Sequence, residues 1–201
     1  GYLLQVQPGG ALLLAKDKHG ELYGRQTLQQ LNNPDGSHPC VTIGDWPKQS
    51  WRRMHVLDSG PATLPQIKKL VRTVLAKNHC NVLVYEIDYN FAFKTHPEIK
   101  GDETGVWTLE QVRDLVQTCR DNGIKVIPEI NCLGHQSWLF PPGALLKAHP
   151  DLEEPPDGST PQTTLSSKDF YCRSWCPLNP KVNPIMFDLF GELLDAFQTD
   201  M

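Results

Sequence analysis

The sequence lacks an excess of basic residues, a long apolar run and a glycine-rich phosphate turn. It has 19 Lys and Arg against 23 Asp and Glu among its 201 residues, which gives a formal net charge of −4. A protein that binds nucleic acid usually carries a basic surface instead. No stretch approaches the ~18 consecutive apolar residues of a membrane-spanning helix. We therefore expect no nucleic-acid partner and no membrane span.

Cysteines with metal-ligand spacing are also scarce. Of the six cysteines, Cys172 and Cys176 have a C-x3-C spacing, and no second pair lies nearby. A zinc site usually takes four ligands in recognisable pairs. Cys119 continues the apolar stripe of a predicted helix, and Cys80 and Cys132 flank predicted strands, so we interpret these three as buried free thiols. We expect no metal and no cofactor.

The first 46 residues predict the end of a small α+β domain. Strand-like "YLLQV" and "ALLLA" flank a turn at Pro8-Gly9-Gly10. Leu22, Leu28 and Leu31 have the spacing of a short helix, which the Asn-Asn-Pro-Asp-Gly cluster at 32–36 must end. We expect the beginning of this domain to precede the sequence.

Residues 47–201 alternate between predicted strands and helices. Apolar runs predict strands at 54–58, 81–88 and 125–131. Pro128 is placed near the end of the third strand because proline has no N–H to donate to a sheet. Strands separated by helices of about 10–15 residues form βαβ units, so the sequence predicts a parallel sheet.

Capping signals and apolar stripes define the helices. Thr63 is predicted to N-cap a helix that buries one stripe of side chains. Thr108 and Gln111 fit a capping box on a helix that ends at Gly123. Asn183 is predicted to N-cap the last helix, with a proline at its first helical position. The stripe of the first helix consists of Ile67, Leu70, Val71, Val74 and Leu75.

Polar residues at the strand ends favour a barrel, although an open doubly wound sheet also fits the alternation. A TIM barrel carries its active site on the face where its strands end, and a complete barrel needs ~250 residues. No glycine-rich turn follows the first strand, which weighs against a dinucleotide-binding sheet. We therefore predict the fold class α/β. Residues 47–201 form a partial (β/α)8 TIM barrel of three to four βα units, truncated before strand four, and residues 1–46 form the end of a small α+β domain.

The candidate site residues are the polar side chains at the strand ends. Glu86 and Asp88 are two residues apart, so both can point the same way from a strand. The long connection 132–182 adds aromatic rings that suit the apolar faces of sugars or simply pack the loop down, and the sequence leaves both open. The polar residues are Asp58, Glu86, Asp88, Glu129, Asn131 and His135, and the aromatic ones are Trp138, Phe140, Tyr171 and Trp175.

Several segments resemble glycoside hydrolase family 20, the β-N-acetylhexosaminidases. "YGRQTLQQL" (23–31) is similar to the family's Tyr-Gly-x-Gln-Thr-Leu-x-Gln-Leu junction between the small domain and the barrel. "DWP" resembles the barrel entry, "RRMHVLD" the first strand and "KNHCNVLVYEID" the second. "GIKVIPEINCLGH" (123–135) resembles the third strand, Pro-Glu-Ile-Asp-x-Pro-Gly-His. "YEIDYNFAF" and "LDSGP" look closer to the hexosaminidase D-like branch.

The resemblance implies an enzyme that removes terminal N-acetylhexosamine from glycans by substrate-assisted retaining hydrolysis, without a cofactor. The acetamido oxygen of the substrate attacks the anomeric carbon, a Glu protonates the leaving oxygen, and an adjacent Asp stabilises the acetamido group. The implied supporting residues of catalysis are His135 and Asp88, and the implied substrate-binding residues are Asp58, Glu86, Asn131 and Trp138.

The sequence departs from the family's pattern in places. Asn131 replaces an aspartate, and the Arg of the family's Leu-Asp-x-x-Arg is missing after Asp58. We expect the catalytic Asp–Glu pair beyond Met201, so that this piece of a longer protein is inactive alone. Two alternatives stay open, a non-catalytic sugar-binding relative and a metal-dependent TIM-barrel hydrolase. The ligands of the latter would be Asp58, Asp88, Glu129 and His135.

Overall fold

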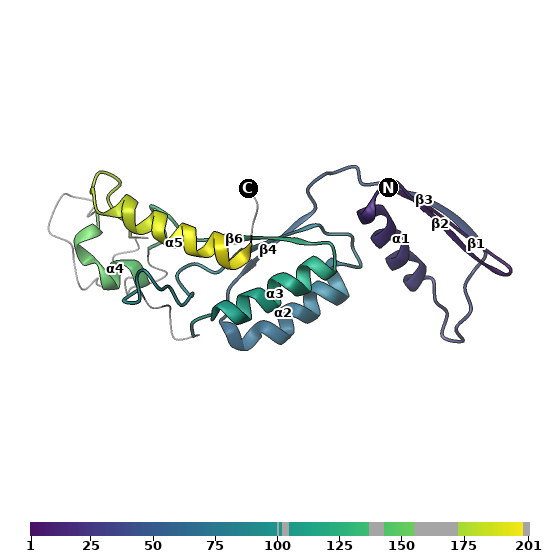
Figure 1. Ribbon diagram of the computed structural model, residues 1–201, viewed down its shortest axis with the longest axis horizontal. Coiled ribbons are helices and arrows are strands. Elements are labelled where there is room, and N and C mark those ends of the chain that lie inside the picture. The colour runs from purple at the N-terminus through teal and green to yellow at the C-terminus, as the bar shows by residue number, and fades with distance from the viewer. Residues whose placement is uncertain (100, 102–104, 137–142, 155–172, 199–201) are drawn as a thin grey trace, which may run out of the picture.

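The structure, a computed structural model, describes residues 1–99, 101, 105–136, 143–154 and 173–198. Figure 1 shows a small unit near the N-terminus and a larger unit built around three strands. The small unit consists of β1 (Tyr2–Gln7), β2 (Gly10–Ala15), α1 (Lys18–Gln30) and β3 (Val41–Asp45). The larger unit consists of β4 (Arg53–Leu57), η1 (Pro61–Thr63), α2 (Leu64–Leu70), η2 (Val71–Leu75), β5 (Val82–Glu86), α3 (Leu109–Asp121), β6 (Lys125–Glu129), α4 (Ala144–Ala148), η3 (Pro150–Leu152) and α5 (Val182–Phe197).

The small unit is an antiparallel sheet in the order β2-β1-β3, with α1 packed against it. Both predicted strands and the predicted helix are confirmed. The third strand, β3, was missed because it is short, contains a glycine and alternates between partly buried and exposed residues. Its pairing with β1 places Ile43 opposite the fully buried Leu4, so the strand completes the small core.

Two glycines let α1 lie close to the strands. A Cβ added at Gly20 would lie 2.3 Å from the carbonyl oxygen of Gly1, and one at Gly24 would lie 2.3 Å from the Leu13 side chain. Across the same interface the hydroxyls of Tyr2 and Thr27 are 2.6 Å apart. The segment that resembled a family junction therefore has a packing role of its own.

The larger unit contains a parallel sheet in the order β4-β5-β6, as predicted. Leu57, Glu86 and Glu129 are in register across it, so the carboxyl ends of all three strands lie at one edge. Pro128 is the second-last residue of β6, where the prediction placed it. The parallel arrangement fits the expected partial barrel.

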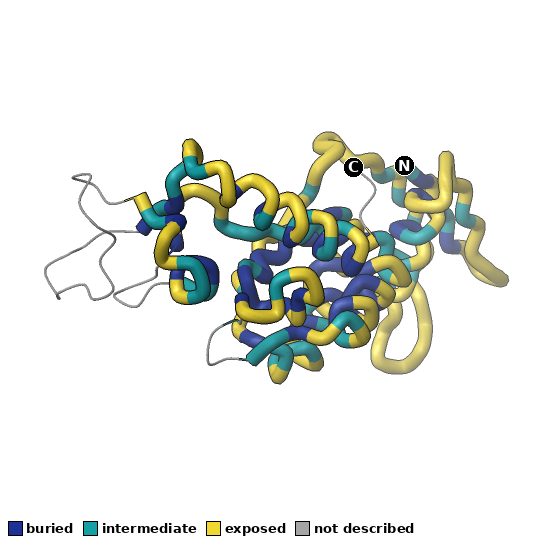
Figure 2. Tube along the Cα trace, turned by 60° about the vertical axis from the view of Figure 1, so that its left-hand side comes forward, coloured by how far each residue is buried: buried dark blue, intermediate teal, exposed yellow. Residues whose placement is uncertain are grey.

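Helices α2, α3 and α5 pack in sequence around one side of this sheet, and Figure 2 shows the buried residues concentrated between them. The capping box of α3 is confirmed, because the Thr108 hydroxyl accepts from the Gln111 N–H at 3.2 Å and the Gln111 side chain accepts from the Thr108 N–H at 3.0 Å. Gly123 follows α3 with a φ of 70°, the left-handed conformation expected after a helix. In the described residues, no helix has both the length and the apolar character needed to cross a membrane.

The first helix of the larger unit differs from the prediction in two details. Thr63 precedes α2, but its hydroxyl donates to the Gly60 carbonyl at 2.7 Å and does not cap the helix, because the 3-10 turn η1 already leads into it. Val74 was expected on the buried stripe and is 42% exposed. The helix passes into the π-helical turn η2, whose wider turns rotate later residues away from a 3.6-residue stripe.

Two further predictions are wrong. Helix α5 begins at Val182 after Lys181 as N-cap, so Asn183 lies inside the first turn. The proline after it is tolerated there because the N–H groups of a first turn have no partner within the helix. Cys132 is exposed because it lies beyond the end of β6, whereas Cys119 is buried as expected.

Candidate functional site

The strand ends bring three ionisable side chains together. His55 on β4 lies between two carboxylates: its Nε2 is 3.0 Å from Glu86 Oε2 and 3.4 Å from Glu129 Oε2. His55 was not among the residues predicted from the sequence. His55 is two residues before Leu57 on β4, so the two side chains point to the same face of the sheet. Leu57 is paired with Glu86, and Glu86 with Glu129, so His55 lies on the face that carries both glutamates.

The predicted residues Glu86, Asp88 and Asn131 lie together, and Glu86 connects them to this histidine. Asn131 donates its Nδ2 to Glu86 Oε1 at 2.9 Å and its backbone N–H to Asp88 Oδ1 at 3.0 Å. The Asp88 N–H in turn donates to the Glu129 carbonyl at 3.1 Å. Glu86 is 8% exposed, and Asp88 lies past the strand in a left-handed turn with a φ of 49°. Both carboxylates therefore reach Asn131, Glu86 from a strand and Asp88 from a turn.

Asp58 is held by hydrogen bonds from the protein itself. Its Oδ1 accepts from the Tyr85 hydroxyl at 2.7 Å, from Trp107 Nε1 at 2.9 Å and from the Gly60 N–H at 2.9 Å, and its Oδ2 accepts from Asn90 at 3.0 Å. Burial raises the pKa of Tyr85, and the bond to Asp58 raises it further, so the phenol stays protonated as a donor. The carboxylate therefore ties the end of β4 to the connection that follows β5.

The segment 131–136 folds back on itself beside Asp88. The Asn131 carbonyl accepts from the Tyr89 hydroxyl at 2.8 Å and from Gln136 Nε2 at 2.9 Å. Burial raises the pKa of Tyr89 well above its ordinary value, and the charge of Asp88 adds to the effect. His135 is exposed on this segment, with a φ of 58°. A non-glycine residue held in this left-handed region is uncommon and is found more often at functional sites.

The aromatic residues of the long connection are only partly described. Trp175 is 6% exposed and belongs to the hydrophobic core, and its backbone N–H donates to the Leu133 carbonyl at 3.0 Å. For this residue the packing interpretation holds. Trp138, Phe140 and Tyr171 lie outside the described residues.

The metal-ligand set considered from the sequence is not the one that the fold assembles. Among the described residues, two clusters of three could hold a metal ion, namely His55, Glu86 and Glu129, and His96, Glu98 and His149. Neither contains Asp58, Asp88 or His135, because Asp58 and Asp88 are directed to donors of the protein itself.

Comparison with known proteins identifies relatives over almost the whole chain. Residues 62–201 match the model for "Glycosyl hydrolase family 20, catalytic domain", and residues 1–46 match that for "Glycosyl hydrolase family 20, domain 2". A beta-hexosaminidase of Akkermansia muciniphila is 31% identical over 222 residues, covering 98% of this chain and 42% of its own length. The human beta-hexosaminidase subunit beta is 30% identical over 215 residues, covering 98% of this chain and 35% of its own length.

Solved structures agree. The chitobiase of Flavobacterium johnsoniae has a TM-score of 0.76 at 26% identity, covering 98% of this chain and 30% of its own. The β-N-acetylhexosaminidase of Bacteroides fragilis has a TM-score of 0.76 at 24% identity, covering 98% of this chain and 40% of its own. The chain thus spans less than half the length of these relatives. By its family matches to both domains, this chain belongs to glycosyl hydrolase family 20.

Proposed function

We propose that the protein to which this chain contributes is a β-N-acetylhexosaminidase-type glycosidase that removes terminal N-acetylhexosamine residues from glycans. The proposal is supported by family membership and by the names of the relatives, which include beta-hexosaminidases and a chitobiase. The partner is therefore an N-acetylhexosamine-containing glycan. The reaction is the substrate-assisted retaining hydrolysis of the family, in which the acetamido group of the sugar acts as the nucleophile.

The observation that carries the proposal is the polar network at the ends of β5 and β6. Glu86 is 8% exposed and accepts a hydrogen bond from Asn131 at 2.9 Å, while His55 lies 3.0 Å from its other oxygen. A carboxylate held from two sides in this way is fixed in position. Fixed acceptors suit the recognition of sugar hydroxyls, because they lose little freedom when a substrate binds.

We assign supporting roles to the flanking residues. Asp88 and His135 are positioning residues at the rim, where Asp88 fixes the backbone of Asn131 at 3.0 Å. Asp58 acts through its contacts with Trp107 and Tyr85, although one oxygen keeps capacity for a further donor. Trp138 is proposed as a sugar-stacking residue on its sequence position alone.

Activity on nitrophenyl glycosides tests the proposal. The complete protein should hydrolyse the 4-nitrophenyl β-glycoside of N-acetylglucosamine or N-acetylgalactosamine, and it should not hydrolyse the matching β-glucoside, which has no acetamido group. We expect the 201-residue chain alone to be inactive. Equal turnover of the glucoside would contradict the substrate-assisted mechanism, and binding of N-acetylhexosamine without turnover by the complete protein would support a non-catalytic relative instead.

Substitutions locate the site. Asn131→Ala removes the donor to Glu86, and Glu86→Gln removes the charge while keeping the shape. Each should reduce kcat/KM by about 10-fold or more, since a lost hydrogen bond to a charged group is worth ~1.5–3 kcal/mol. Glu21→Gln, at an exposed position on α1 of the small unit, is the matched control and should leave kcat/KM unchanged.

A further inference from the structure

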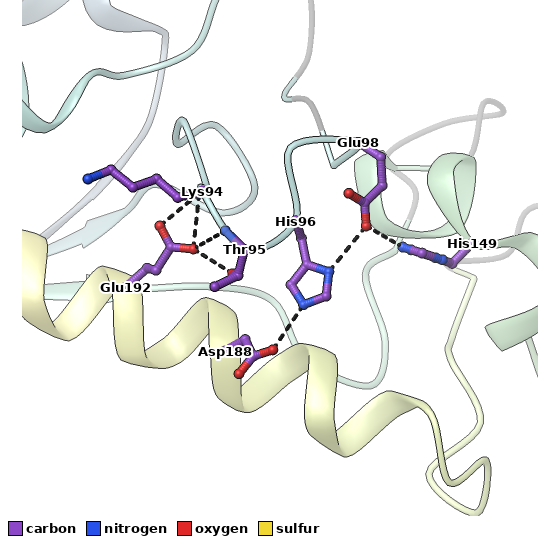
Figure 3. A network of polar contacts seen from close by, with 7 residues as sticks. All are labelled: Lys94, Thr95, His96, Glu98, His149, Asp188 and Glu192. Carbon is purple, nitrogen blue, oxygen red and sulfur yellow. Dashed lines mark hydrogen bonds and ion pairs between the residues drawn. The ribbon is translucent and has the colours of Figure 1, made fainter.

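A second group of ionisable residues lies apart from the strand ends, where three segments of the chain meet (Figure 3). His96 and Glu98 lie in the connection between β5 and α3, and His149 follows α4 directly. Glu98 Oε1 is 3.1 Å from His96 Nδ1 and 3.0 Å from His149 Nε2. One ligand atom from each residue lies within 4.8 Å of the other two. The two histidines therefore converge on a single carboxylate oxygen.

The ring of His96 has carboxylates at both nitrogens. Its Nδ1 faces Glu98 at 3.1 Å, and its Nε2 faces Asp188 of α5 at 3.2 Å. A neutral imidazole has one N–H, so it can donate to one of these oxygens only. The other nitrogen would then present a lone pair to an oxygen lone pair. A positive centre beside Nδ1, either a proton or a cation, removes that conflict.

The surrounding contacts fix the geometry in advance. Asp188 and Glu192 are four residues apart on α5 and so share a face of the helix. Glu192 accepts from the N–H groups of Lys94 at 2.9 Å and Thr95 at 2.8 Å, so the segment just before His96 is anchored to α5 (Figure 3). A carboxylate that holds the remote nitrogen of a ligand histidine is the usual outer partner of a metal site.

We propose that His96, Glu98 and His149 bind one zinc ion, with Asp188 orienting His96. Two imidazoles and a carboxylate are ligands that zinc prefers, and a tetrahedral site with bonds of ~2.0–2.1 Å places its ligand atoms ~3.3 Å apart. The separations of Glu98 Oε1 from His149 Nε2 (3.0 Å) and from His96 Nδ1 (3.1 Å) are close to that ligand–ligand distance. The charges of Glu98 and Asp188 balance that of the ion, and the fourth position is open to water.

Solvent access supports the proposal. The exposed fractions of the side chains are 17% for His96, 26% for His149 and 44% for Glu98, so an ion can enter without unfolding the chain. The other cluster of the described residues is a weaker zinc site, since His55 is its one imidazole and Glu86 there also accepts from Asn131. The proposed ion would join the β5–α3 connection to the end of α4, beside α5.

Titration of zinc chloride into the metal-stripped complete protein at pH 7.5 tests the proposal by calorimetry. We expect the protein to bind zinc at one or more sites per chain. One of these sites should be lost in His149→Ala and also in Glu98→Ala. Asp188→Asn should weaken it about 10- to 100-fold, as loss of such an outer partner does. His38→Ala, at an exposed position outside both clusters, and His55→Ala should leave it intact.

A second readout separates metal binding from folding defects. Saturating zinc should raise the Tm of the unsubstituted protein and of His38→Ala, and it should not raise that of His149→Ala, provided that circular dichroism shows each variant folded. The proposal is overturned if the protein takes up no zinc at pH 7.5, if the site survives in a His96→Ala/His149→Ala variant, or if His55→Ala alone abolishes it.

Discussion

Replacing Arg173 by methionine should strongly destabilise the protein, because it leaves a buried carboxylate without its cation. Arg173 Nη1 lies 2.9 Å from Glu153 Oε2, and the side chains are 2% and 7% exposed. Breaking a buried pair by removing one partner costs ~3–5 kcal/mol. For a domain of this size each kcal/mol lowers Tm by about 2–4 °C, so Arg173→Met should lower Tm by about 6–20 °C.

The loss of stability in Arg173→Met should depend on pH, and the pKa of Glu153 determines its direction. Burial raises the pKa of Glu153, and the charge of Arg173 partly opposes that shift. Without Arg173 the opposition is lost, so the folded-state pKa rises further above its unfolded value. Stability from a group of this kind is present below the unfolded pKa and is lost as pH rises through the folded pKa. The deficit of Arg173→Met should therefore grow as pH rises through the folded-state pKa that Glu153 has in the unsubstituted protein.

A double-mutant cycle isolates the pair from the other contacts of Arg173. Glu153→Leu and Arg173→Met together replace the ion pair by apolar side chains, which is often neutral or stabilising relative to the intact pair. We expect the double variant to recover most of the loss in urea unfolding. A loss below ~1 kcal/mol for Arg173→Met, additive single effects, or a deficit that shrinks with rising pH would refute the reasoning.

Three further predictions concern single hydrogen bonds and backbone geometry. Trp107→Phe removes the Nε1–H that donates to Asp58 at 2.9 Å and should lower the free energy of unfolding in urea by ~1–3 kcal/mol. Gly123→Ala places a side chain at a φ of 70° and 2.4 Å from a leucine methyl, so it should lower the free energy of unfolding by ~1–2 kcal/mol. Gly191→Ala lies within α5 and has nothing near the added Cβ, so it should raise the free energy of unfolding by ~0.5–1 kcal/mol. Equal effects of the two substitutions would contradict this account. Burial opposes ionisation of Glu192, but the hydroxyl and N–H groups that donate to it outweigh burial and lower its pKa. Glu192→Gln should therefore lower the free energy of unfolding at pH values above the unfolded-state pKa of Glu192, and this loss should vanish as pH falls through the lower folded-state pKa. A loss of stability confined to acidic pH would contradict this prediction.

Much of the fold could be predicted from the sequence because its signals are local. The capping box of Thr108 with Gln111 lies within one turn of helix, and the end of α3 at Gly123 needs only a residue that accepts positive φ. The failures have non-local causes. β3 exists because it pairs with β1, and Val74 is exposed because the helix changes to π geometry, which no apolar spacing indicates.

The candidate site divides in the same way. Glu86, Asp88 and Asn131 could be predicted because strand ends of a parallel sheet share an edge, and the structure does bring these three together. His55 was missed because its position beside Glu86 depends on the register between two strands, which the sequence of either strand does not specify. Whether Asp88 and His135 act in catalysis stays a prediction.

The two polar clusters are joined by one stretch of chain. The connection leaving β5 contributes Asp88 to the strand-end network and, a few residues later, His96 to the proposed zinc site. Between them Phe91 is buried and forms a β-bridge with Trp107, whose Nε1 holds Asp58. The first part of this connection is fixed by Asn131 at Asp88, by the bridge at Phe91, and by α5 at residues 94–96. Its course therefore depends on partners that are distant in the sequence, and a zinc ion bound by His96 would restrain the same segment that carries Asp88.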